Sequence, residues 1–259
     1  MNLTDSDVLK FQRGTPILLE DICAIYPVTL GEIVDLGYDT FLQYLSLLTT
    51  VKPENIKGNP ELNEIIKDLT DFQYILMTVA LDPQANQMFK DAFKFFCKEN
   101  VLFSLDPAQI IVGPVEEKHI LNEDNFYDFQ RILRRMYFLE TEGEEIIINE
   151  TDDIITRNLK KKMRENREKV RRAKAKKNEK DKSDLNFSDL IGSVTINNCG
   201  LNMTNIWDIT YYAFNDQLKR MGWRDQFNIN TQAAMAGAKM KKSQLKHWMR
   251  SIANSDKNN

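Results

Sequence analysis

Residues 158–182 form the most highly charged run of the sequence. They include 13 lysines and arginines against four acidic residues, and they lack glycine, proline and aromatic side chains. The residues of this run are strong helix formers. Leu159, Met163 and Val170 provide only a narrow apolar stripe, however, and a helix with so little to bury is marginal in isolation. We therefore predict a basic helical or flexible linker over residues 158–183, which divides the chain into two parts.

The two parts joined by this linker differ in charge. Residues 1–157 carry 13 lysines and arginines against 28 acidic residues, a net charge of −15. Residues 183–259 carry nine against six, a net charge of +3. Charge asymmetry of this kind is typical of separate modules with different partners. We expect an acidic, mostly helical N-terminal domain over 1–157 and an aromatic-rich helical C-terminal module over 184–259.

The composition indicates a folded protein that does not span a membrane. Hydrophobic residues make up 42% of the 259 residues and charged residues 28%, which is enough apolar material for a packed core. No apolar run approaches the ~18 residues of a membrane-spanning helix, and the first residues are acidic and polar, unlike a secretory signal peptide. Three widely separated cysteines, Cys23, Cys97 and Cys199, favour reduced thiols in a cytosol.

The N-terminal domain is predicted to be mainly α with a few short β-strands, an α+β domain. Two apolar runs on either side of Glu20-Asp21 predict a small β-hairpin. Thr29 and Glu32 have the spacing of a capping box at a helix start. Apolar residues at helical spacing predict further helices, and the segment 71–82 is apolar nearly all round, which predicts a buried helix. Short strands around a turn are expected between residues 101 and 114, and the segment 122–125 is expected to cap a helix over residues 126–139.

The C-terminal module contains all three tryptophans of the chain. A short helix is expected to end near Ile191, before Gly192-Ser193. A second helix capped by Thr204 or Asn205 should run to Met221 and break at Gly222-Trp223. Two further short helices are expected over 232–238 and 243–252.

A module of 76 residues cannot bury that much aromatic surface alone, so part of it is expected to bind a partner helix. The alternative interpretation is that these stripes form the core of three packed helices. The candidate partner-binding residues are Trp207, Tyr211, Phe214, Leu218, Trp223 and Trp248.

The sequence does not favour an enzyme. His119 and His247 are the two histidines, and His119 is expected in a solvated loop without metal-ligand spacing. Phosphate-binding and dinucleotide-binding glycine motifs are missing. We therefore predict no catalytic residue, no metal site and no cofactor. The basic run 158–182 would attract nucleic-acid phosphates, but it has no aromatic residue for base stacking, so a linker role is favoured over nucleic-acid binding.

Two segments resemble a known family. The segment 205–220, which begins Asn205-Ile206-Trp207-Asp208, and the Ala-rich and tryptophan-containing helices after it resemble the C-terminal region of tail assembly proteins from long-tailed bacteriophages of Gram-positive hosts. Residues 9–17 and 25–33 resemble the opening of the same proteins. The resemblance covers roughly the first 50 and last 75 residues, and residues 50–180 carry no family-specific motif.

The resemblance implies a tail assembly chaperone. Such a protein works in the host cytoplasm, is absent from the finished virion, and binds and solubilises the tape measure protein, a long hydrophobic helical rod. Its N-terminal part self-associates, and its C-terminal part recruits tail tube subunits. Many weak apolar contacts along one rod would provide avidity without chemistry. The alternatives are a structural virion protein of the tail or neck and a nucleic-acid-binding protein that uses residues 158–182.

Overall fold

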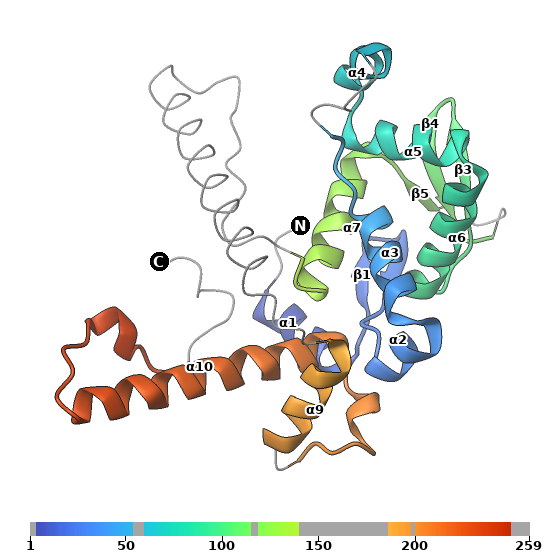
Figure 1. Cartoon of the computed structure of the whole chain (residues 1–259). Helices are drawn as coiled ribbons and strands as arrows, with labels where there is room; N and C mark the ends of the chain where they lie inside the picture. Colours follow the sequence, from blue (N-terminus) through green and yellow to red (C-terminus); the bar gives the residue numbers. More distant parts are fainter. Residues whose placement is uncertain (1–3, 54–59, 115–118, 140–185, 198–199, 250–259) are drawn as a thin grey trace. The chain divides into compact units, whose positions relative to one another are not determined.

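The computed structural model describes residues 4–53, 60–114, 119–139, 186–197 and 200–249 (Figure 1). The chain divides into two compact units. The first unit comprises Met1–Glu140 and Gly200–Gly222, and the second comprises Thr141–Cys199 and Trp223–Asn259. Among the described residues the structure is mostly helical with two small antiparallel sheets, which confirms the predicted mainly α fold.

The first unit contains most of the elements. In chain order they are α1 (Asp5–Arg13), β1 (Ile17–Leu19), β2 (Cys23–Ile25), α2 (Leu30–Leu36), α3 (Tyr38–Leu48), α4 (Pro60–Lys67), α5 (Asp71–Leu81), α6 (Pro83–Cys97), β3 (Val101–Leu105), β4 (Ala108–Val112), β5 (His119–Leu121), α7 (Glu123–Met136) and the 3-10 turn η1 (Ile206–Asp208). Strands β1 and β2 form the predicted hairpin, with Ile17 opposite Ile25. The second sheet has the order β3-β4-β5.

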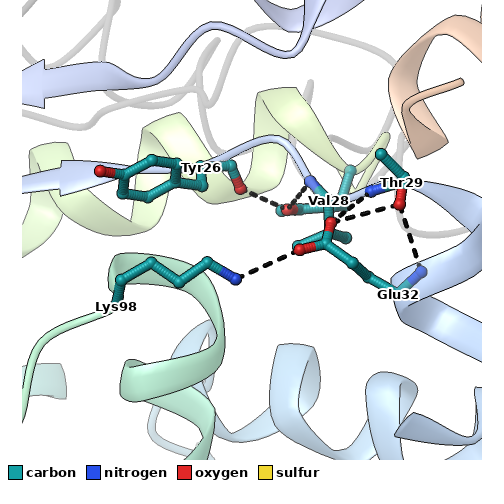
Figure 2. Close-up of polar contacts among 6 residues, drawn as sticks. Tyr26, Val28, Thr29, Glu32 and Lys98 are labelled. Atoms are coloured by element: carbon teal, nitrogen blue, oxygen red, sulfur yellow. Dashed lines mark hydrogen bonds and ion pairs between the residues drawn. The ribbon is translucent and has the colours of Figure 1, made fainter. Parts of the chain in front are cut away.

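Side-chain caps fix where these helices begin. Thr29 caps α2 through the predicted capping box: the Glu32 N–H donates to Thr29 Oγ1 (3.2 Å), and the Thr29 N–H donates to Glu32 Oε2 (2.8 Å). Figure 2 shows this pair and the ion pair between Glu32 and Lys98 at 3.3 Å. Asn122 caps α7, which begins at Glu123, three residues before the predicted start at Phe126. Asp82, with Pro83 at the first helical position, begins α6.

Removing the Thr29 cap tests how much this helix start contributes. Thr29→Ala removes the side-chain hydroxyl that accepts from the Glu32 N–H, so the free energy of unfolding should fall by about 1 kcal/mol. Thr29→Ser is the matched control, because it keeps the hydroxyl and should retain most of the stability. Urea unfolding of the two full-length variants measures the difference. Equal losses in both variants would show that the methyl group, rather than the cap, stabilises this site.

The core of the first unit is aromatic. Phe93 and Phe129 stack with ring centroids 5.4 Å apart, and Phe41 lies at the centre of a second cluster, 6.1 Å from Phe96 and 5.6 Å from Tyr137. All five side chains are buried. Because α3, α6 and α7 each supply part of these clusters, ring packing holds the three helices together.

Two predictions for the N-terminal part were wrong in detail. Helix α5 buries only one face, with Phe72 and Ile75 inside, whereas Leu81 is exposed. His119 lies in strand β5 rather than in a loop, where it pairs with Val112 of β4. The three-residue strand is too short for its alternation to be visible in the sequence.

The C-terminal elements also differ from the prediction. Helix α9 spans Phe187–Asn197 and continues through Gly192. Helix α10 spans Tyr211–Met235, so it begins later than predicted and continues through Gly222. A Cβ atom at Gly192 or Gly222 would meet nothing within 4 Å, so neither glycine marks a turn or a close approach.

The last predicted helix is replaced by the short 3-10 turn η2 (Lys242–Leu245), and residues 246–249 are not helical. Its predicted end, 250–252, lies outside the described part of the chain.

The grouping of the C-terminal residues differs from the predicted boundary at 184. Residues 200–222 belong to the first compact unit, and α10 contributes to both units. The predicted linker 158–183 lies outside the described residues. The physical reason for the new grouping is a set of contacts between residues 205–216 and the N-terminal elements, among them the bridge between Thr29 and Thr210.

Candidate protein-interaction surface

Residues 205–216, called here the docking segment, add a short strand-like contact to the N-terminal unit. Thr210 forms an antiparallel bridge with Thr29. On either side of this pair, the Leu30 N–H donates to the Ile209 carbonyl (3.0 Å) and the Tyr211 N–H donates to the Val28 carbonyl (2.9 Å). These bonds connect parts of the chain about 180 residues apart in sequence, so they could not be predicted from local pattern.

Side chains of the docking segment complete the contact. The buried hydroxyl of Thr210 donates to the carbonyl of Phe11 at 2.8 Å and accepts from the Ala213 N–H at 3.0 Å, which starts α10 at Tyr211. Asp216 is also buried. Its carboxylate accepts from Arg220 Nε at 2.9 Å and from Gln12 Nε2 at 3.4 Å. The polar groups that the docking segment buries are therefore paired.

Two tyrosine rings anchor the docking segment. Tyr211 lies 5.2 Å from Phe41 and 5.9 Å from Tyr137, measured between ring centroids. Tyr212 lies 5.3 Å from Phe11 and 4.8 Å from Phe138. Aromatic pairs in this distance range stabilise a core beyond the area that they bury. The docking segment is consequently part of the core of the first unit.

Tyr137 supports the chain just before the docking contact. Its hydroxyl donates to the Tyr26 carbonyl (3.0 Å) and accepts from the Val28 N–H (3.2 Å), and Figure 2 shows Tyr26 and Val28 beside the Thr29 cap. Burial raises the pKa of the Tyr137 phenol well above its ordinary value. Burial raises the pKa of Tyr211 as well. Both phenols therefore stay protonated in the folded chain at a pH at which an exposed tyrosine ionises.

This pKa difference predicts a loss of stability at alkaline pH. Above pH ~10 the unfolded chain releases a proton that folded Tyr137 retains, so the free energy of unfolding falls as the pH rises. Tyr137→Phe should reduce the alkaline slope by up to about 1.4 kcal/mol per pH unit. The same change should lower the stability at neutral pH by about 1–3 kcal/mol, because the Val28 N–H loses its partner.

The measurement is urea unfolding at several pH values on both sides of pH ~10. Tyr127→Phe is a control, because Tyr127 is exposed on α7. Parallel pH profiles for wild type and Tyr137→Phe would contradict the assignment.

The second unit presents apolar side chains to solvent. Ile229 is 60% exposed and Met235 is 85% exposed, both on the second half of α10, and Met249 is 69% exposed near the end of the described chain. Trp223, Phe227 and Trp248 are partly exposed. We call these six residues the C-terminal apolar surface. Those on α10 lie on more than one side of the helix, because successive helical residues are about 100° apart, and their number in a short segment makes it a candidate binding site for another protein.

The chain after α10 folds back on the helix within this unit. Asn230 Nδ2 donates to the Gln244 carbonyl at 2.6 Å, and the ring of His247 lies 5.0 Å from Phe227 and 5.7 Å from Trp248. Residues 223–249 carry five lysines and arginines against one acidic residue. The C-terminal apolar surface is therefore set among positive charges.

The six predicted partner-binding residues do not lie together in one unit. Phe214 is buried in the first unit, and Tyr211 contacts the rings of Phe41 and Tyr137 there. Trp207 is partly exposed, and its indole N–H donates to the Met203 carbonyl at 2.8 Å. Leu218 is partly exposed on α10, and Trp223 and Trp248 belong to the second unit.

Sequence reasoning missed the residues that make the docking contact. Tyr212, Thr210 and Asp216 are buried, although none of them belongs to the predicted apolar stripe. Tyr212 and Asp216 lie one turn apart on α10, whereas Phe214 lies about 200° round the helix from Tyr212. The first two turns of α10 are thus buried on two sides, a pattern that a single-stripe analysis does not detect. The signal available in the sequence was Tyr212, because it is an aromatic residue outside the predicted apolar stripe.

Neither a metal site nor a membrane span stands out in the described ranges. No three of the described His, Cys, Asp or Glu side chains are grouped so that they could hold a metal ion. None of the helices that the structure describes is both long and apolar enough to cross a membrane. Cys23 and Cys97 are buried and not disulfide-bonded.

Comparison with known proteins gives one match. Residues 176–253 match the family model of the second domain of YomV, a phage-derived protein family of Bacillus. The matched segment covers less than a third of the chain and includes both the docking segment and the C-terminal apolar surface. No curated protein and no solved structure matches the chain. The C-terminal part of the chain is therefore similar to a phage-associated domain.

Proposed function

We propose that the chain is a tail assembly chaperone of a long-tailed bacteriophage and that its C-terminal apolar surface binds the tape measure protein. The match to a phage-associated domain supports the phage assignment. The resemblance of residues 205–220 and of the chain start to tail assembly proteins supports the chaperone role. The observation that carries the proposal is the exposure of Ile229, Met235 and Met249 in the matched segment.

The binding mode follows from the chemistry of this surface. Methionine side chains adapt to many apolar helix faces, and tryptophan rings add a large rigid apolar contact area, so together they suit a long rod whose sequence changes along its length. The five basic residues of 223–249 favour a partner in which acidic residues flank the apolar face. Binding requires no covalent bond to the partner, and each apolar contact can be weak. Several chaperone copies on one rod then bind with avidity.

The proposal includes two further partners and a location. Tail tube subunits would compete with the chaperone for the tape measure protein as the tube grows. Copies of the chaperone would self-associate through the N-terminal unit. The work would take place in the host cytoplasm, and the protein would be absent from the mature virion. A role in the virion, as a structural protein of the tail or neck, is the outcome that would replace this proposal.

Co-expression with the phage's tape measure protein tests the function. That protein is expected to be the product of a very long neighbouring gene that encodes an apolar helical chain. With the full-length chaperone, the tape measure protein should move from the insoluble to the soluble fraction and co-purify with the chaperone. If it stays insoluble at matched expression levels, the chaperone role is excluded. Stoichiometric amounts of the chain in purified virions would favour the structural role instead.

A further inference from the structure

The docking contact joins two parts of the chain that are distant in sequence. One part comprises residues between positions 11 and 138, and the other is the docking segment, residues 205–216. Sixty-six residues, 139–204, intervene. A chain of that length spans at most about 200 Å with α9 remaining helical. Nothing in the bonds themselves therefore requires that both parts come from one molecule.

We propose that the docking segment is exchanged between two copies of this chain, so that each copy completes the N-terminal unit of the other. In the exchanged form, every contact that the docking segment makes within one chain is made instead between the two chains, including the Thr29–Thr210 bridge. The proposed partner is thus a second copy of this chain. The interaction surface on each N-terminal unit is the backbone of 28–30 together with the rings of Phe11, Phe41 and Tyr137. This inference does not depend on the proposed chaperone role.

Burial at the docking site favours a filled site over an open one. Phe11, Val28, Phe41 and Tyr137 are all buried, and each of them contacts the docking segment through a hydrogen bond or an aromatic ring. An N-terminal unit without a docked segment would expose this aromatic surface to water. It would also leave the Leu30 N–H and the Val28 carbonyl without their partners. A unit that loses its own segment therefore gains free energy by accepting the segment of a neighbour.

Local concentration decides between the closed and the exchanged form. Because the contacts are the same in both forms, the free energies differ mainly in the entropy of association and of the connecting chain. Because one chain joins the docking segment to its own N-terminal unit, the closed form is favoured at low chain concentration. Exchange should therefore increase with chain concentration, and it should be strongest where copies are held side by side.

The Thr29–Thr210 pair allows a direct test by disulfide formation. The flanking hydrogen bonds run from Leu30 to Ile209 and from Tyr211 to Val28, so Thr29 and Thr210 form a non-hydrogen-bonded antiparallel pair. The Cα atoms of such a pair are typically about 4.5 Å apart, which lies within the range that a disulfide spans. Cysteines at these two positions should be joined when oxidised glutathione accepts the two electrons and two protons.

The experiment uses two full-length variants with different affinity tags, both in a Cys199→Ser background. One carries Thr29→Cys, the other carries Thr210→Cys, and the two are co-expressed and oxidised after purification. The expected result is a disulfide-linked heterodimer that carries both tags, with a yield that rises with chain concentration. Replacing the Thr210→Cys partner by Gln217→Cys provides the control for random collision, because Gln217 is exposed on the same helix. That pair should give no heterodimer.

A third variant makes a negative result informative. Thr29→Cys and Thr210→Cys in one chain should form an intrachain disulfide, which shows that the cysteines are compatible with the docked geometry. If this bond forms while the two single variants remain monomeric at every concentration, exchange is excluded. A heterodimer that forms equally with Gln217→Cys would also overturn the proposal.

A second pair covers the case in which the cysteine variants fail to fold. Gln12 already bonds to Asp216, so Gln12→Lys combined with Asp216→Asn places a new amine opposite the carboxylate of a co-expressed wild-type chain. Carbodiimide should then link residues 12 and 216 between the two chains, as identified by mass spectrometry of the linked peptide. The absence of that peptide, while a single chain carrying Gln12→Lys alone forms the link internally, would contradict exchange.

Discussion

Replacing Phe214 by alanine is expected to lower the free energy of unfolding of the first unit by about 3–5 kcal/mol. Phe214 is 1% exposed, and it lies on α10 within the segment that docks against N-terminal elements. Truncating a buried phenylalanine removes its transfer free energy and leaves a cavity. A loss of this size is a large part of the total stability of a typical domain, about 5–15 kcal/mol. The N-terminal elements should therefore unfold at clearly lower urea concentration, although the change is far from them in sequence.

Gln217→Ala is the matched control for Phe214→Ala. Gln217 is exposed on the same helix, so its truncation should change the stability by less than about 0.5 kcal/mol. Both full-length variants would be unfolded in urea and followed by far-UV circular dichroism. A loss below about 1 kcal/mol for Phe214→Ala would contradict a core position for Phe214, because truncating a buried phenylalanine leaves a cavity and costs more than this.

The second large effect is expected on partner binding. Ile229→Asp combined with Met235→Asp should weaken binding of the tape measure protein by about 100-fold, equivalent to about 3 kcal/mol. Each of these exposed side chains would contribute about 1.5 kcal/mol or more if it is buried on binding, and each carboxylate would lose solvation at an apolar interface. The folded chain itself should be little affected, because both side chains are exposed.

Asn228→Asp combined with Gln232→Glu is the matched control for this double variant. Both residues are exposed on α10, and the pair changes the net charge by the same amount without removing apolar surface. Its binding should fall only by the electrostatic part of the effect. The measurement is the amount of tape measure protein that remains soluble and co-purifies with each full-length variant. Equal losses in the two double variants would show that charge, rather than apolar contact, governs binding.

Local sequence signals predicted the elements that local contacts determine. The hairpin around Glu20-Asp21, the capping box of Thr29 and Glu32, and the Asn122 cap are all made by residues within a few positions of one another. Such signals can be recognised without knowledge of the tertiary fold. The same local basis explains why the mainly α class with short strands was confirmed.

The predictions that failed depended on distant contacts. Thr204 and Asn205 were reasonable caps by residue type, but Thr210 starts α10 because its hydroxyl also binds the Phe11 carbonyl, 199 positions away. Gly222 was expected to break the helix, yet an isolated glycine costs only about 1 kcal/mol inside a helix. Tertiary contacts of the first turns of α10 outweigh that cost.

The candidate site was only partly accessible to sequence reasoning. The apolar excess of the C-terminal part was recognised from its tryptophans, and the structure shows exposed Ile229, Met235 and Met249 there. The assignment of individual residues to core or surface was not accessible, because a single stripe at helical spacing is common to both. The sequence pattern predicts Phe214 and Tyr211 as partner contacts, whereas both pack within the first unit of the structure.

Amide hydrogen exchange of the full-length chain, alone and bound to the tape measure protein, shows which residues the partner covers. If the C-terminal apolar surface binds the partner, amides within 223–249 should exchange more slowly in the complex, and those of α5 and α7 should exchange at unchanged rates. Slower exchange confined to residues 4–139, with 223–249 unaffected, would contradict the account.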